Sequence, residues 1–110
     1  MLIIRPAGQD RYALYEDAAY TGGVTVYPKG DIFSLGILIV PAMRRRGLAL
    51  QALNQITQMY FDRGFKACVN HVAADNIASI RLHERAGFMW EAESLTAAQR
   101  VLTFKKSGVI

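Results

Sequence analysis

The ten residues from 40 to 49 read Val40-Pro41-Ala42-Met43-Arg44-Arg45-Arg46-Gly47-Leu48-Ala49. Before them, residues 32–40 are nearly all apolar, which predicts a strand buried on both faces. Pro41 and Ala42 end that strand. From Gly47 to Gly64, apolar residues recur at the 3.6-residue spacing of a helix. The stretch therefore predicts a strand, a short turn and a helix in direct succession.

The turn between this strand and helix has the chemistry of an anion site. Backbone N–H groups at a helix start have no partner within the helix and carry partial positive charge, which suits a phosphate. Gly47 and Ala49 leave room at the backbone, and the consecutive Arg44, Arg45 and Arg46 supply cations that pair well with phosphate. The segment is neither a Walker loop nor the dinucleotide-binding glycine pattern. On spacing alone, a solvated basic turn that opens an ordinary helix is an equal alternative.

A second informative stretch reads Asn76-Ile77-Ala78-Ser79-Ile80-Arg81-Leu82-His83-Glu84-Arg85-Ala86-Gly87-Phe88. It predicts a helix to about residue 85, which Asp75 or Asn76 can cap. Asn76, Ser79 and His83 recur at steps of three or four residues, so they share one helix face. Polar side chains on that face indicate that part of it lines a ligand cleft.

Working outward from these stretches, the rest of the chain alternates between strand patterns and turns. Residues 6–10 have turn composition, so no helix is expected between the first two strands. A strand–helix–strand crossover joins strands 32–40 and 66–72, which implies that they are parallel. The predicted fold is α+β (α/β-like): a mixed, mostly antiparallel sheet with helices packed on it, in one domain over 1–110. Further strands are expected at 2–5, 11–16, 19–27, 88–92 and 101–105.

Composition narrows the cellular context and the partners. The chain has 110 residues, 52% of them hydrophobic, and a net charge of +4. Cys68 is the only cysteine, so no intramolecular disulfide can form, which favours a reducing compartment. Residues 1–10 lack the apolar centre of a signal peptide, and the longest apolar run, 35–43, is shorter than the roughly 20 residues of a membrane helix. We expect a soluble cytoplasmic protein with no membrane partner.

The two quoted stretches together resemble the GNAT acetyltransferases. Arg44, Gly47 and Ala49 match the acetyl-CoA signature Arg/Gln-x-x-Gly-x-Gly/Ala after the fourth strand. In the second stretch, His83 stands where the family most often has tyrosine. The other positions match directly at Asn76, Leu82, Glu84, Gly87 and Phe88, and conservatively at Ser79 and Arg85.

The resemblance implies a site for acetyl-CoA as cosubstrate, with no metal. Backbone groups of Leu38, Ile39 and Val40 would hold the pantetheine arm and the acetyl carbonyl. Backbone amides from Arg45 to Leu50 would hold the pyrophosphate. The full set of residues implied to bind the cofactor is Leu38, Ile39, Val40, Arg44, Arg45, Arg46, Gly47, Leu48, Ala49, Leu50, Asn76 and Ser79.

Two histidines are candidates for catalysis: His83 through the resemblance, and His71 through its place near the end of the strand at 66–72. His83 would donate a proton to the departing thiolate, since an imidazole titrates near 6.5 and a thiol near 8.5. Its alternative role is to pack against the cofactor or to cap nearby backbone. His71 is a candidate general base, and the alternative is a histidine bonded to neighbouring backbone. Cys68, in the middle of a predicted strand, is expected to be inert.

One departure from the family limits these implications. GNAT enzymes usually place two helices between the first and second strands, where they cover the acceptor amine. Here the acceptor side is expected to be open or completed by a second subunit, which favours a homodimer. The expected function is transfer of acetyl from acetyl-CoA directly to a primary amine. A non-catalytic CoA-binding or regulatory subunit is the alternative; a nucleic-acid partner is not expected, because only one basic cluster is present.

Overall fold

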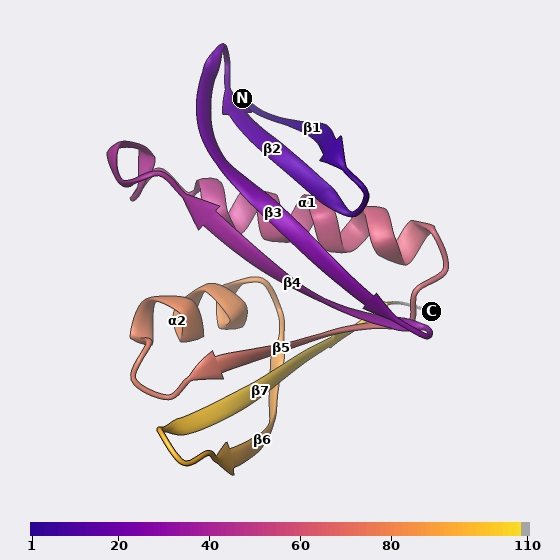
Figure 1. Ribbon diagram of the computed structural model, residues 1–110, viewed down its shortest axis with the longest axis vertical. Helices are drawn as coiled ribbons and strands as arrows, with labels where there is room; N and C mark the ends of the chain where they lie inside the picture. The colour runs from indigo at the N-terminus through magenta and orange to yellow at the C-terminus, as the bar shows by residue number, and fades with distance from the viewer. Residues whose placement is uncertain (109–110) are drawn as a thin grey trace.

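The computed structural model describes residues 1–108 (Figure 1). Seven strands form one sheet in the order β1-β2-β3-β4-β5-β7-β6. The β4–β5 pair is parallel and the other neighbouring pairs are antiparallel. The predicted mixed α+β sheet with one parallel pair is confirmed. The elements are β1 (Leu2–Gly8), β2 (Arg11–Glu16), β3 (Ala19–Lys29), β4 (Ile32–Ile39), a short 3-10 turn (Pro41–Met43), α1 (Leu48–Asp62), β5 (Ala67–Ala73), α2 (Ile77–Arg85), β6 (Met89–Leu95) and β7 (Arg100–Ser107).

The β1–β2 hairpin has no helix between its strands, as the sequence predicted. The prediction of a turn over residues 6–10 was too long, because β1 continues through Pro6 to Gly8. Proline is tolerated there since β1 is an edge strand of the sheet. Pro28 likewise lies within β3, three residues beyond Thr25, where the pairing of β3 with β2 ends. Both prolines thus sit where a missing N–H leaves no gap in the ladder.

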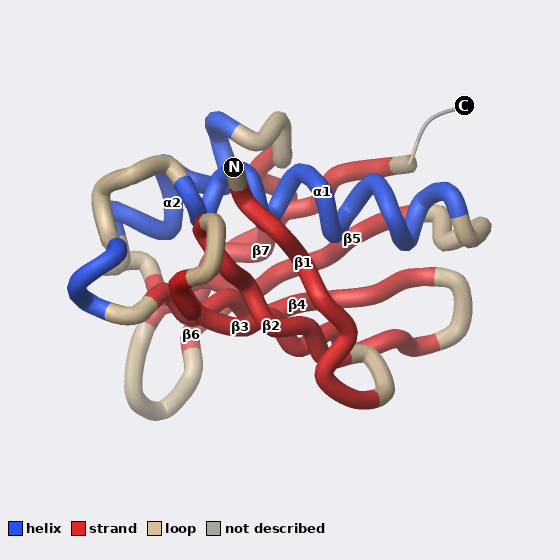
Figure 2. The backbone as a smooth tube through the Cα atoms, turned by 90° about the horizontal axis from the view of Figure 1, so that it is seen from above, coloured by secondary structure: helices blue, strands red, loops and turns tan. Residues whose placement is uncertain are grey.

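Both helices cover the same face of the sheet (Figure 2). The buried apolar side chains form one cluster between this face and the helices. Helix α1 contributes residues at helical spacing, among them the fully buried Leu53, Ile56 and Tyr60. Among residues 1–108, neither helix has the length and apolar character that a membrane crossing requires.

The prediction that the fourth strand is buried on both faces was wrong. Phe33 and Ile39 point toward the helices and are buried, whereas Leu38, of opposite parity, is 66% exposed. The reason is that no described helix covers the other face of β4. A strand with apolar residues on both sides is not necessarily buried on both sides. The arrangement of the helices decides which side becomes part of the core.

The parallel β4–β5 pair is short and determines where a cleft can form. Only two residue pairs are in register, Ile32 with Ala67 and Phe33 with Cys68. Beyond them β4 remains paired with β3 up to Ile39, and β5 remains paired with β7 up to Ala73. The two strands therefore separate from Phe33 and Cys68 onward. The middle of the sheet opens toward the turn that contains Arg44, Arg45 and Arg46, called the Arg-rich turn below.

Candidate functional site

The opening between β4 and β5 is bridged by one side chain. The backbone N–H of Leu35 donates to Asn70 Oδ1 at 2.9 Å. Leu35 and Asn70 lie two residues beyond the last register pair on each strand. Asn70 is 4% exposed and faces the helices. A side-chain amide thus replaces the backbone pairing that a continuous ladder would have at this level.

The backbone of β4 beyond Leu35 faces this opening at alternate residues. The backbone groups of an antiparallel strand point alternately to its two neighbours, and Leu35 N–H points toward β5. The groups of Ile37 and Ile39 therefore turn the same way. The N–H of Val40 donates instead to the carbonyl of Thr21 at 2.8 Å. Of the predicted residues Leu38, Ile39 and Val40, Ile39 is the one whose backbone turns toward the opening.

The turn after β4 is exposed and leads into an uncapped helix. Gly47, the residue before α1, has φ 75°, and no side chain caps the helix start. The first bond within the helix runs from Gln51 N–H to the Gly47 carbonyl at 3.1 Å. The amides of Leu48, Ala49 and Leu50 therefore have no partner within the helix. A Cβ added at Gly47 would meet no atom within 4 Å, so the backbone there is accessible.

The arginines of the turn add positive charge to these amides. The Nε–H of Arg44 donates to the Ile39 carbonyl at 3.0 Å, which folds that side chain against the end of β4. Arg45 and Arg46 are exposed. Among residues 1–108, no ion pair engages any of the three arginines. The first turn of α1 also contains no acidic residue. A diphosphate would meet unopposed positive charge here.

His83 lies buried on the α2 side of the sheet, 7% exposed. Its Nδ1 lies 2.8 Å from the Ser79 carbonyl, and its Nε2 lies 3.0 Å from Asn70 Nδ2. The ring packs against Phe88 and Phe104, with centroids 5.0 and 5.5 Å away. Burial lowers the pKa of His83 below its usual value, only partly offset by the bond to the Ser79 carbonyl. The imidazole is therefore neutral at pH 7, with both nitrogens engaged.

Asn76 and Ser79 occupy the first turn of α2. Asn76 Oδ1 accepts a bond from Ser79 N–H at 3.2 Å and so caps the helix, one of the two caps that the sequence allowed. The Ser79 carbonyl accepts from His83. The Asn76 side chain and the Ser79 backbone thus bond within the helix, and they fix the start of α2 and the orientation of His83.

His71 lies on the opposite face of the sheet from His83. It neighbours Asn70 in β5, so its side chain points away from the helices. Its Nδ1 lies 3.1 Å from the Thr103 hydroxyl, and the side chain is exposed. The structure therefore does not bring the two histidines together; it places one on each side of the opening between β4 and β5.

The helix-free face carries a broad hollow of about 590 Å³ over β1 to β4. Tyr20, Tyr27 and Leu38 line it and are 54%, 60% and 66% exposed. Arg11 contributes a cation at one edge. This is the side that the sequence predicted to lack a helical cover.

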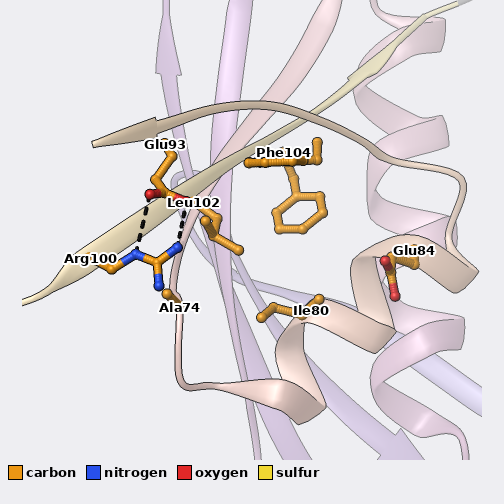
Figure 3. Close-up of a pocket in the computed structure, with 8 residues that line it drawn as sticks. Ala74, Ile80, Glu84, Glu93, Arg100, Leu102 and Phe104 are labelled. Atoms are coloured by element: carbon orange, nitrogen blue, oxygen red, sulfur yellow. Dashed lines mark hydrogen bonds and ion pairs between the residues drawn. The ribbon is translucent and has the colours of Figure 1, made fainter. Parts of the chain in front are cut away.

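A smaller hollow of about 250 Å³ lies between α2 and the β6–β7 hairpin (Figure 3). Ile80, Leu102 and Phe104 form its apolar part. Arg100 donates from Nη2 and Nε to the two carboxylate oxygens of Glu93, at 2.7 and 3.2 Å, so these charges neutralise each other. Glu84 also lines the hollow, and no residue that the sequence predicted for the site does.

Asn70 is the site residue that sequence reasoning missed. It is the single amide between Cys68 and Val72, which both point into the core. A buried polar side chain needs a partner, and this was the available signal. Cys68 itself is buried, and burial raises the pKa of its thiol to about 12, so it stays protonated.

Comparison with solved structures places this architecture among acetyltransferases. The spermidine N-acetyltransferase from Vibrio cholerae, solved with CoA and spermine, superposes with a TM-score of 0.82 at 19% identity. The match covers 89% of this chain and 64% of that one. The ribosomal-protein-S18-alanine N-acetyltransferase from Escherichia coli gives 0.80 at 19% identity, covering 94% and 73%. The protein yncA from Salmonella typhimurium, solved with its cofactor acetyl-CoA, gives 0.76 at 19% identity, covering 88% and 63%.

This chain thus spans less than two thirds of the length of the Vibrio and Salmonella proteins. At these identities the likeness concerns the fold. No curated protein matches the chain in sequence. The sequence pattern of the acetyltransferase (GNAT) family matches residues 3–88, from β1 to the end of the second quoted stretch. The chain belongs to the GNAT family of acetyltransferases.

Proposed function

We propose that this chain is an N-acetyltransferase that moves acetyl from acetyl-CoA directly to a primary amine, with residues 1–110 acting as a single acyl-CoA-binding domain. One observation carries the proposal. The β4–β5 pairing ends at Phe33 and Cys68, and the resulting opening leads to an uncapped, cation-rich helix start. When bound, acetyl-CoA supplies an activated acetyl group as a thioester.

The turn and the start of α1 fit the diphosphate of such a cosubstrate. The unpaired amides of Leu48, Ala49 and Leu50 are donors for its oxygens, and the space at Gly47 admits it. Arg45 and Arg46 are free to form charge-assisted bonds with it. The same residues would hold CoA after transfer, so they serve binding more than the chemical step.

The backbone of β4 fits an extended ligand arm. The N–H and carbonyl of Ile37 and the N–H of Ile39 turn toward the opening and can pair with amides of the arm as an added strand would, whereas the Ile39 carbonyl already accepts from Arg44. Leu35 N–H is unavailable, because Asn70 already accepts from it. The arm would therefore end near Leu35, at the closed end of the opening.

The amine would approach from the helix-free face. That face is hollowed over β1 to β4, and His71 lies on it, exposed and bonded to Thr103. A primary amine must lose a proton before it attacks, and we propose that His71 accepts that proton directly or through water. Tyr20 and Tyr27 offer hydroxyls and aromatic faces to the acceptor.

His83 is the proposed proton donor to the departing thiolate. Its present hydrogen bonds must change before it can donate a proton. Nε2 accepts from Asn70 and carries no proton in this arrangement. Donation requires that the ring gain a proton and that Nε2 leave the Asn70 amide. We expect the acetyl-transfer rate to depend on this protonation.

A non-catalytic CoA-binding subunit is a second candidate, and two observations favour it. The acceptor side has no helical cover among residues 1–108, and both His83 nitrogens are already engaged. Such a subunit would bind CoA through the same turn without turnover. CoA binding combined with failure to acetylate any member of an amine panel would support this candidate over the enzyme.

Thermal unfolding with acetyl-CoA, CoA or ATP tests the proposed cosubstrate. A ligand at 100 times its Kd stabilises the folded protein by about 2.7 kcal/mol. We expect comparable stabilisation by CoA and acetyl-CoA, and less by ATP. A larger effect of ATP, or none from CoA, would contradict the proposal. Acetyl transfer to a panel of polyamines, amino acids and peptides then tests catalysis.

We also propose a homodimer. The exposed Tyr20, Tyr27 and Leu38 on the sheet face, and the fully exposed edge strand β6, are surfaces that a second subunit can cover. Light scattering after size-exclusion chromatography measures the mass, and a monomer at micromolar concentration would contradict this.

A further inference from the structure

We propose that Asn70 is a positioning residue of the acetyl-transfer site. Its side chain bridges β4 and β5 where their pairing ends, and it holds the His83 ring with Nε2 as a hydrogen-bond acceptor. The inference rests on the proposed function, because it concerns the same opening. It adds a residue that the family motifs do not contain.

The register shows why the bridge lies at Leu35. If the parallel ladder continued beyond Phe33 and Cys68, Leu35 and Asn70 would stand level with each other. Instead, the Leu35 N–H donates to the Asn70 side chain at 2.9 Å and not to a backbone carbonyl of β5. A side chain reaches farther than a backbone carbonyl, so the two strands are tied together at a wider spacing. The width of the opening at its closed end therefore depends on this amide.

The direction of every bond in the network follows from Leu35. A backbone N–H can only donate, so the Asn70 atom facing it is the oxygen Oδ1. The NH₂ group of Asn70 then faces His83 and donates to Nε2 at 3.0 Å. Nε2 must be an unprotonated acceptor, so Nδ1 carries the ring proton and donates to the Ser79 carbonyl at 2.8 Å. One backbone group thereby fixes the amide orientation and the imidazole tautomer.

The surroundings of the ring add no competing charge. Phe88 and Phe104 pack against it, and both are buried. From β5, Cys68 is a neutral buried thiol, 3.7 Å from Asn70 Oδ1. From β7, Lys106 directs Nζ to the Ala86 carbonyl at 2.7 Å. On α2 itself, Glu84 and Arg85 are exposed. A protonated ring would place an N–H against the Asn70 NH₂ group, so Asn70 disfavours the charged form.

Asn70→Asp is the most informative variant. A carboxylate keeps an acceptor for Leu35 N–H but presents an acceptor, not a donor, to His83 Nε2. The ring is then expected to carry a proton on Nε2, and an adjacent negative charge favours the imidazolium. Asn54→Asp is the matched control, because Asn54 is exposed on α1. Asn70→Leu removes both hydrogen bonds while keeping the branched shape of the side chain.

Nitrogen NMR of the histidine ring tests the network without any cosubstrate. In the wild type at neutral pH, we expect a proton on Nδ1 and none on Nε2 of His83. In Asn70→Asp, we expect protonation at Nε2 and a titration midpoint at higher pH; Asn54→Asp should match the wild type. A wild-type ring protonated on Nε2 would overturn the inference, and this measurement needs no folded variant.

Acetyl transfer supplies the second readout. In Asn70→Asp, the part of the kcat profile that depends on His83 protonation should move to higher pH, with the KM for acetyl-CoA nearly unchanged. Asn70→Leu should lower kcat about 10²-fold by misplacing the strand and ring. An active wild type with Asn70 variants that behave like Asn54→Asp would overturn the inference alone. A wild type that neither binds CoA nor transfers acetyl would instead contradict the proposed function, while the NMR result still decides the network.

Discussion

The hydroxyl of Tyr60 donates a 2.6 Å hydrogen bond to the carboxylate of Asp10, which joins α1 to the turn between β1 and β2. The Tyr12 hydroxyl lies 2.9 Å from that of Tyr60 and completes the cluster as a donor. Tyr60 is fully buried, and Arg63 lies over its ring at 4.4 Å. The bond anchors the first hairpin to the helix whose start forms the candidate diphosphate site.

Asp10→Ala is expected to lower the free energy of unfolding by about 1.5–3 kcal/mol more than Asp17→Ala, since hydrogen bonds to charged groups contribute on this scale. Asp17 is the matched control because both residues have φ 56°, so both substitutions carry the same backbone strain. The Asp17 carboxylate is exposed and lies 3.7 Å from the N-terminal amine. Urea unfolding measures both variants; equal losses would show that the bond to Tyr60 adds no stability.

The same cluster predicts an alkaline limit. Burial, followed by the bond to Asp10, raises the pKa of Tyr60 above its usual value of 10. The folded state therefore holds the phenol proton more tightly than the unfolded state does. This contribution to stability is complete below pH 10 and declines as the pH rises above it. Tyr60→Phe should remove that decline, as urea unfolding at pH 8 to 11 would show.

Gly22→Ala should destabilise the protein by about 1–3 kcal/mol through overpacking. A Cβ on Gly22 would collide with the backbone carbonyl oxygen of Leu38 on the neighbouring strand. Gly36→Ala is the control, because a Cβ there would meet no atom within 4 Å. We expect that control to be neutral or slightly stabilising. Thermal unfolding compares the two, and a Gly22 variant as stable as the Gly36 variant would contradict the close approach of β3 and β4.

Local sequence signals predicted much of this architecture. The strand–turn–helix at residues 40–49, the cap at Asn76 and the helix-free first hairpin all depend on residues close in the chain. The two prolines inside strands were misread because their tolerance depends on strand pairing: Pro6 lies in an edge strand, and Pro28 lies where β3 has no β2 partner. The open face of β4 was missed for a similar reason: an apolar run does not tell where the helices will pack.

The candidate site was predicted less completely than the fold. The Arg-rich turn is a local feature, so its amides without helical partners could be expected from the sequence. The Leu35–Asn70–His83 network joins residues 13 to 48 positions apart, and it exists only because β4 and β5 separate after two pairs. Neither the length of that pairing nor the faces of His71 and His83 can be deduced from motif spacing.

Acid should weaken the fold through His83. Burial lowers its pKa in the folded state below the usual 6.5, so the unfolded state binds the proton first. The stabilising contribution of the neutral ring is complete above pH 6.5 and is lost as the pH falls toward the folded-state pKa. His83→Phe should unfold with a shallower pH dependence over that window, although it is less stable at pH 8. Parallel stability curves for the wild type and the variant from pH 4 to 8 would contradict this.

We expect the affinity of the Arg-rich turn for CoA to depend on ionic strength. Arg45 and Arg46 are exposed and without ion-pair partners among residues 1–108, so their attraction for a diphosphate is screened by salt. Replacing both with glutamine should raise the Kd for CoA about tenfold at low salt, equivalent to about 1.4 kcal/mol. The difference should shrink as salt increases. Lys29→Gln is the control, because Lys29 is exposed at the end of the sheet where β4 begins, away from the turn that follows β4. Calorimetric titration at several salt concentrations gives the slopes, and a double variant with the same slope as the wild type would place the diphosphate elsewhere.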